Sequence, residues 1–256
     1  MPRLLAALPV VLCTAASAEL PSHCYTGYAY HAHSDDLAFT AHYRPVDEHD
    51  PPLRWRVVYR DAGGEIIGRK SMDLSHNRFI PEFRLRVLSS GDTAGIRRGP
   101  EGDWRMFKRE GPNGEVVVEP FEPRPGMVGD SGIHPFVQSR FERLMAGEPV
   151  TFDFVLAARQ KIADMRIHRI EDTMLDGERA VRFRVTVDML LADWFVEDLV
   201  LTYDPGSKRL LTYRGISNMQ DESGEPYPVL VRYRPGSPPP VTQAGGGCGA
   251  GGETAR

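Results

Sequence analysis

The chain has few cysteines, no long apolar run in its body and no excess of positive charge, and each lack excludes a class of protein. With three cysteines among 256 residues, a metal site built from paired cysteines is excluded. No internal stretch reaches the roughly 20 apolar residues of a membrane-spanning helix, so we expect no transmembrane segment. The 31 lysines and arginines are outnumbered by 35 aspartates and glutamates. This balance is poorly suited to nonspecific nucleic-acid binding, and no nucleic-acid partner is expected.

The first residues have the organisation of a cleavable export signal. Arg3 supplies the positive charge, residues 4–12 form a short apolar core, and residues 16–18 (Ala-Ser-Ala) are a small-x-small cleavage site. The pattern predicts a signal peptide over residues 1–18 and a mature chain that begins at Glu19. We therefore expect a periplasmic protein, or one released further outside the cell.

Cleavage of that signal removes Cys13 and leaves Cys24 and Cys248 at opposite ends of the mature chain. A disulfide bond between them is compatible with an oxidising compartment. The glycine-rich surroundings of Cys248 favour two unpaired thiols, and we expect the thiols to be unpaired. Cys13 itself is not expected to carry a lipid anchor, because Leu12 is larger than the residue that usually precedes a lipidated cysteine.

Most of the mature chain alternates apolar and polar residues with the period of a β-strand. Residues 179–188 are typical, since valine and phenylalanine at every second position alternate with arginine and threonine. Short turn sequences separate such segments, and Asn113-Gly114 is a strong hairpin signal. The pattern predicts about eleven strands joined by short turns, which favours an antiparallel meander.

One segment has the 3.6-residue period of a helix instead. Its apolar stripe consists of Val137, Phe141, Leu144 and Met145. Asp130 or Ser131 is placed to cap the start of this helix, and Gly147 suits the position just after its end. A single amphipathic helix needs an apolar surface, so we expect it to pack on the apolar face of the sheet.

These patterns together predict a mainly β (α+β) domain over residues 19–234. It would be a large curved antiparallel sheet, or half-barrel, with one amphipathic helix on its apolar face. Residues 235–256 are rich in proline and glycine and are expected to form a disordered tail. The concave apolar face is either a filled core or a partly open cavity, and the sequence is compatible with both.

The sharpest short motif is Gly129-Asp130-Ser131-Gly132. It matches the segment around the nucleophile of chymotrypsin-like serine proteases. A serine hydrolase that uses Ser131 is therefore one alternative function, and it requires a histidine within hydrogen-bond reach of that serine. A helix cap explains the same residues more simply, so we expect neither a catalytic residue nor a cofactor.

Two further groups of polar residues have both a binding explanation and a simpler one. His31 and His33 would project to one face of a strand, as zinc ligands do, but no second pair of ligands follows. We therefore expect no metal site. Arginines that alternate along strands could meet an anionic headgroup, but more often they are solvent-facing residues that discourage edge pairing. Examples are Arg54, Arg56, Arg60, Arg166 and Arg169.

Residues 210–233, with the helical region 126–147 and the strand 150–156, resemble a group of uncharacterised proteobacterial exported proteins. The layout is also similar to the lipoprotein-carrier class of half-barrels, in which a helical lid covers the apolar face of a curved sheet. The resemblance covers roughly residues 25–233 and concerns layout alone. It implies an apolar or lipid-like ligand, or a lipoprotein, held between sheet and helix.

We therefore predict a non-catalytic periplasmic envelope protein that binds an apolar or lipid-like ligand or a lipidated partner. Burial against apolar side chains would hold the ligand. The residues expected to line this site are Phe141, Met145, Phe152, Phe154, Phe183, Val185 and Val187. One alternative is a structural or assembly protein of the envelope with a filled core and no ligand, and the other is the serine hydrolase.

Overall fold

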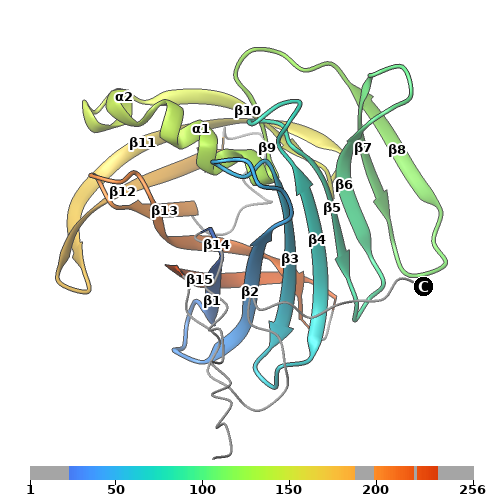
Figure 1. The fold of residues 1–256 in the computed structure, drawn as a ribbon, viewed down its shortest axis with the longest axis horizontal. Helices are drawn as coiled ribbons and strands as arrows, with labels where there is room; N and C mark the ends of the chain where they lie inside the picture. Colours follow the sequence, from blue (N-terminus) through green and yellow to red (C-terminus); the bar gives the residue numbers. More distant parts are fainter. Residues whose placement is uncertain (1–22, 188–198, 222–223, 236–256) are drawn as a thin grey trace, which may run out of the picture.

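The computed structural model describes residues 23–187, 199–221 and 224–235. The predicted signal peptide and nearly all of the predicted tail lie outside these residues. Within them the chain forms one open, mostly antiparallel sheet of fifteen strands with two short helices (Figure 1). This confirms the predicted mainly β fold with a large curved sheet. The strands outnumber the eleven expected, partly because Thr93–Arg98 and Met127–Gly129 show little apolar alternation.

The first eight strands form a continuous antiparallel meander in which each strand pairs with the next. They are β1 (Tyr25–His31), β2 (Leu37–Pro45), β3 (Arg54–Asp61), β4 (Ile66–Asp73), β5 (Glu82–Val87), β6 (Thr93–Arg98), β7 (Trp104–Arg109) and β8 (Val116–Phe121). Strand β8 is one edge of the sheet. At the β3–β4 turn, Gly64 has a φ of 91°, a backbone conformation that glycine adopts without steric cost.

The remaining elements complete the sheet from its other edge. They are β9 (Met127–Gly129), the 3₁₀ helix η1 (Asp130–Gly132), α1 (Ile133–Ser139), α2 (Phe141–Met145), β10 (Val150–Leu156), β11 (Lys161–Leu175), β12 (Glu178–Val187), β13 (Leu199–Tyr203), β14 (Leu210–Gln220) and β15 (Pro226–Pro235). Strand β9 pairs in parallel with β10 and forms the second edge. Strand β15 pairs with β1 and so joins the two halves.

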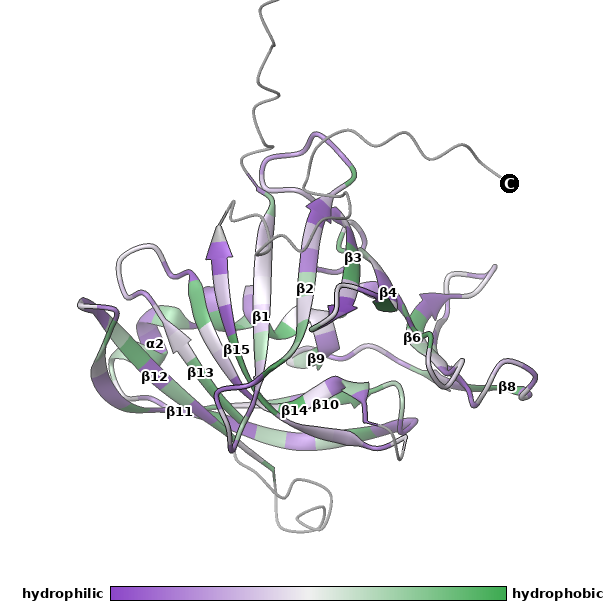
Figure 2. Ribbon diagram, turned by 90° about the horizontal axis from the view of Figure 1, so that it is seen from below, coloured by the Kyte–Doolittle hydropathy of each residue, from purple (hydrophilic) through white to green (hydrophobic). Residues whose placement is uncertain are grey.

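The two faces of the sheet differ because side chains alternate along each strand. In β12, Val181, Phe183 and Val185 are buried on the face that carries the helices, while Arg182 and Arg184 project from the opposite face. We call these the inner face and the outer face. Figure 2 shows the resulting alternation of hydrophobic and hydrophilic bands along the strands.

The inner face holds two apolar clusters. The first, which we call the helix-side core, fills the space between the helices and β10–β13. Its fully buried members include Val128, Phe136, Val137, Phe141, Leu144, Ile167, Phe183, Leu201 and Tyr203. The second cluster lies mainly on the inner face of β1–β7 and includes Ala29, Phe39, Val57, Ile96 and Met106, against which Met219 of β14 packs.

The sheet curls until elements from its two halves meet across the inner face. The backbone N–H of Gly129, at the end of β9, donates to the carbonyl of Phe79 over 2.7 Å. Lys70 of β4 forms an ion pair with Asp130 of η1. The curl therefore follows from contacts between residues that lie far apart in the sequence.

The helical region differs from the single helix that we predicted. It divides at Arg140, which has φ −111° and ψ 8° and belongs to neither α1 nor α2. The Ser139 hydroxyl donates to the Phe136 carbonyl over 2.6 Å, and such local bonds compete with the helical backbone ladder and bend helices. Neither helix has a side-chain cap, so the predicted capping by Asp130 or Ser131 is wrong.

Cys24 is buried at the start of β1 and is disulfide-bonded. Our expectation of an unpaired thiol is therefore wrong for Cys24. The other cysteine of this bond lies outside the part of the chain that the structure describes.

Candidate functional site

All seven residues that we predicted to line an apolar site lie together in the helix-side core or at its margin. Phe141, Phe152, Phe183 and Val185 are buried, and Met145, Phe154 and Val187 are partly buried. The Phe141 and Phe183 rings meet edge to face with their centres 5.5 Å apart. These side chains fill the space beneath the helices with one another, so a ligand at this place would have to displace α1 and α2. Ligand binding by this set stays a prediction.

The serine motif lies at the junction of β9 and the helices, but its side chains are separately engaged. The Ser131 hydroxyl is buried and has no hydrogen-bond partner among the described residues, so none of their histidines is within its reach. Asp130 pairs with Lys70. His134 Nδ1 lies 3.2 Å from the Tyr203 hydroxyl, and burial lowers the pKa of His134 to about 4. In the described part of the chain this motif therefore lacks the serine–histidine contact that a hydrolase needs.

The histidines near the N-terminus do not gather ligands for a metal. His31 stacks on Tyr227 with ring centres 5.2 Å apart. Across the described ranges, no group of three or more histidine, cysteine, aspartate or glutamate side chains is arranged to hold a metal ion.

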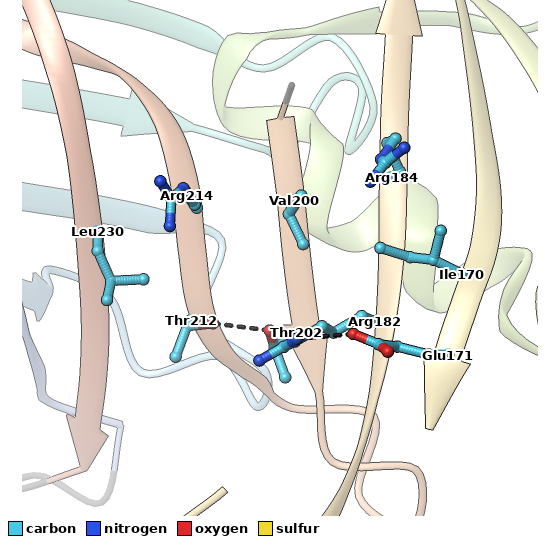
Figure 3. Close-up of a pocket in the computed structure, with 9 residues that line it drawn as sticks. All are labelled: Ile170, Glu171, Arg182, Arg184, Val200, Thr202, Thr212, Arg214 and Leu230. Atoms are coloured by element: carbon cyan, nitrogen blue, oxygen red, sulfur yellow. Dashed lines mark hydrogen bonds and ion pairs between the residues drawn. The ribbon is translucent and has the colours of Figure 1, made fainter. Parts of the chain in front are cut away.

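A groove of about 480 Å³ lies on the outer face of β11–β15 (Figure 3). Two rows of cross-strand neighbours form its lining. Arg184 of β12 is followed by Val200, Arg214 and Leu230 on β13, β14 and β15. In the next row, Glu171, Arg182, Thr202 and Thr212 follow one another from β11 to β14. Ile170 completes the groove.

Among the described residues that line this groove, positive charge dominates, because three of them are arginines and one is a carboxylate. Arg182 Nη1 donates to Glu171 Oε1 over 2.7 Å, so one arginine is neutralised. Arg214 is exposed on β14. Beside the groove, Arg232 lies over the Tyr30 ring, and its buried Nε has no hydrogen-bond partner among the residues described. The local charge is therefore suited to an anion, despite the net negative charge of the whole chain.

The floor of the groove combines polar and apolar groups. The Thr212 hydroxyl donates to the Thr202 hydroxyl over 2.8 Å, and both threonines are buried. Val200 projects between Arg184 and Arg214, Leu230 lies beyond Arg214, and Ile170 is an exposed apolar residue at the rim (Figure 3). We call this lining, from Ile170 to Leu230, the arginine groove.

A second groove of about 370 Å³ lies next to the first, where the α2–β10 turn meets β11 and β12. Its lining consists of Gly147, Pro149, Arg166, His168, Arg169 and Thr186. The two grooves are neighbours because His168, in the second, is the cross-strand partner of Arg184, in the first. We call the second groove the Arg166 groove.

The sequence contained part of the signal for these grooves. Arg166 and Arg169 were considered as contacts for an anionic headgroup, and the alternation of arginine along β12 is visible in the sequence. Arg214, Val200 and Leu230 were missed, because only the register of β13, β14 and β15 places them beside Arg184.

Comparisons with protein-family models, with curated proteins and with solved structures found no match to this chain. None of the helices in the described ranges has the length and apolar character needed to cross a membrane.

Proposed function

We propose that this protein is a non-catalytic binding protein of the cell envelope and that it binds a lipid-like, amphipathic anion in the arginine groove. The proposal keeps the lipid-like ligand that the sequence led us to expect and moves its site from the inner face to the outer face. One observation carries it: the described lining of this groove contains three arginines, one carboxylate and three apolar side chains. The predicted signal peptide supports a periplasmic location.

The chemistry of the groove matches each part of such a ligand. The planar guanidinium groups of Arg184 and Arg214 suit a phosphate or carboxylate, which they bind through paired N–H donors. Ile170, Val200 and Leu230 offer apolar surface to a chain that extends from the acidic group. Hydrogen bonds that involve a charged group contribute about 1.5–3 kcal/mol each, so two arginines supply enough free energy for a measurable affinity.

The filled inner face favours one alternative, a structural or assembly protein of the envelope that binds no small ligand. Phe141 and Phe183 are almost fully buried against each other and against Tyr203, which is typical of a core. This alternative explains the inner face but gives no role to the arginine groove. The two functions differ in whether the purified protein carries or binds a ligand.

The first test is native mass spectrometry of the mature protein purified from the periplasm, followed by solvent extraction and lipid analysis. A stoichiometric acidic lipid supports the proposal. Titration calorimetry then compares octyl phosphate with inorganic phosphate and with octanol, and we expect octyl phosphate to bind most tightly because it uses both parts of the groove.

Variants locate the site. Arg214→Ala should weaken octyl phosphate binding about tenfold, which corresponds to the loss of about 1.4 kcal/mol. Arg69→Ala is the matched control, because Arg69 is also exposed on the outer face but belongs to β4 in the other half of the sheet. Two results together would refute the proposal. The wild-type protein would purify without lipid, and it would bind octyl phosphate no better than the Arg214→Ala variant does.

A further inference from the structure

We infer that the ligand carries two acidic groups, and that the Arg166 groove binds the second group while the arginine groove binds the first. This inference rests on the proposed function, because it extends the same outer-face site along β11 and β12. It narrows the ligand class from an amphipathic anion to an amphipathic molecule with two separate acidic groups, such as a bisphosphate.

The ladder between β11 and β12 places lining residues of the two grooves next to each other. Thr186 pairs with Arg166, Arg184 with His168 and Arg182 with Glu171, in that order along β12. From Thr186 to Arg182 is four residues of strand, or roughly 13 Å at about 3.3 Å per residue. One extended ligand can therefore reach both grooves, and Arg184 is the residue of the arginine groove that adjoins the Arg166 groove through His168.

The charges support a second acidic group. Two arginines and no carboxylate are among the described residues that line the Arg166 groove. Arg169 is fixed in place, because its Nη1 donates to the Met145 carbonyl over 2.9 Å and its Nη2 to Asp172 over 2.5 Å. Arg166 is exposed and has no ion pair among the described residues. An acidic group here would compensate a cation that has no acidic partner among the residues described.

The carboxylates nearby do not close the grooves to anions. Glu171 is held by Arg182 and Asp172 by Arg169, so each is already paired with a cation. Asp164 projects from the outer face of β11 beyond Arg166, and its cross-strand neighbour is Asp153, which pairs with Arg124. Arg166 therefore keeps a positive charge that no carboxylate of the described residues pairs with.

A ligand whose two acidic groups occupy both grooves should bind more tightly than a ligand with one acidic group, because its second contact is made within one complex. The test compares two probes by titration calorimetry, octyl phosphate and the bisphosphate of the straight-chain octanediol. We expect the bisphosphate to bind at least about tenfold more tightly, in line with one further charged hydrogen-bonded contact.

Arg166→Ala separates the two grooves. It should abolish most of the advantage of the bisphosphate and leave octyl phosphate binding unchanged, while the Arg69→Ala control leaves both affinities unchanged. Circular dichroism and the melting temperature confirm that each variant is folded.

The possible outcomes are distinct. Normal octyl phosphate binding without any gain for the bisphosphate overturns this inference and leaves the proposed function intact. A bisphosphate advantage that persists in Arg166→Ala also overturns it, because the second acidic group would then bind elsewhere. If neither probe binds, both the proposed function and this inference fail.

Discussion

The ion pair between Lys70 and Asp130 joins the two halves of the curled sheet, and breaking it should destabilise the protein strongly. Lys70 Nζ lies 2.5 Å from Asp130 Oδ2, and sixty residues separate the two in the sequence. The Lys70 side chain is 5% exposed, whereas that of Asp130 is 31% exposed. The Lys70 ammonium also lies 4.8 Å from the centre of the Phe83 ring. Lys70 is therefore the partner that cannot turn to water if the pair is lost.

The exposures set the expected magnitudes. Removing one partner of a buried ion pair costs about 3–5 kcal/mol, because the other charge stays buried and unpaired. We expect Asp130→Asn to lower the free energy of unfolding by about 3 kcal/mol, since it leaves the charge of Lys70 buried and unpaired. Lys70→Met should cost less, about 2 kcal/mol, because Asp130 keeps some access to water. The double variant should cost clearly less than the two single losses added together, because neither charge is then stranded.

Urea unfolding of the wild type, both single variants and the double variant measures these free energies. The matched control is the pair Arg143–Glu148, whose nitrogen and oxygen lie 3.1 Å apart with side chains 56% and 60% exposed. Breaking this exposed pair should cost at most about 1 kcal/mol. Either of two results would refute the reasoning. The losses of unfolding free energy for Asp130→Asn and Lys70→Met could add without coupling in the double variant, or they could fail to exceed the loss in the control.

Two further predictions concern the helix-side core. Phe183→Ala should lower the free energy of unfolding by about 3–4 kcal/mol, because it opens a cavity beside Phe141 and Tyr203. A loss below about 1 kcal/mol in urea unfolding would show that this face is not a packed core. His134 should make the protein sensitive to mild acid. Burial lowers its pKa from 6.5 to about 4, so the unfolded chain binds the proton more tightly. The stability from the neutral imidazole is present above about pH 6.5 and is lost as the pH falls toward about 4. The urea midpoints measured at neutral pH and at pH near 5 should therefore differ less in His134→Gln than in the wild type. Equal differences in the two proteins would contradict the assignment of the acid sensitivity to His134.

The strands and their two faces were predictable from the sequence because alternation is a local property. Phe183 and Val185 alternate with Arg182 and Arg184, and the structure places the two sets on opposite faces of β12. The prediction was poorer where that local signal is weak. Strand β9 has only three residues, too few to show a period of two, and the helical stripe gave no sign of the break at Arg140.

The candidate site was only partly predictable, because it depends on which strands become neighbours. The sequence identified arginine on strand faces, including Arg166, but offered no reason to connect Arg184 with Arg214. That connection needs β13 between them in a register that pairs Val200 with both arginines. The sequence pattern of Phe183 and similar apolar residues fits a ligand site and a packed core equally well. We assigned these residues to a ligand site, because a core residue and a pocket residue have the same sequence pattern.

The sequence by itself determined that this chain forms a large, mainly antiparallel sheet with one apolar and one arginine-bearing face. Side-chain alternation and turn residues act over a few positions and need no distant partner. Only the tertiary structure decided that the inner face is filled, that Lys70 meets Asp130, and that grooves open on the outer face. Each of these outcomes depends on register, curl and packing between residues far apart in the chain, and no local pattern encodes those distances.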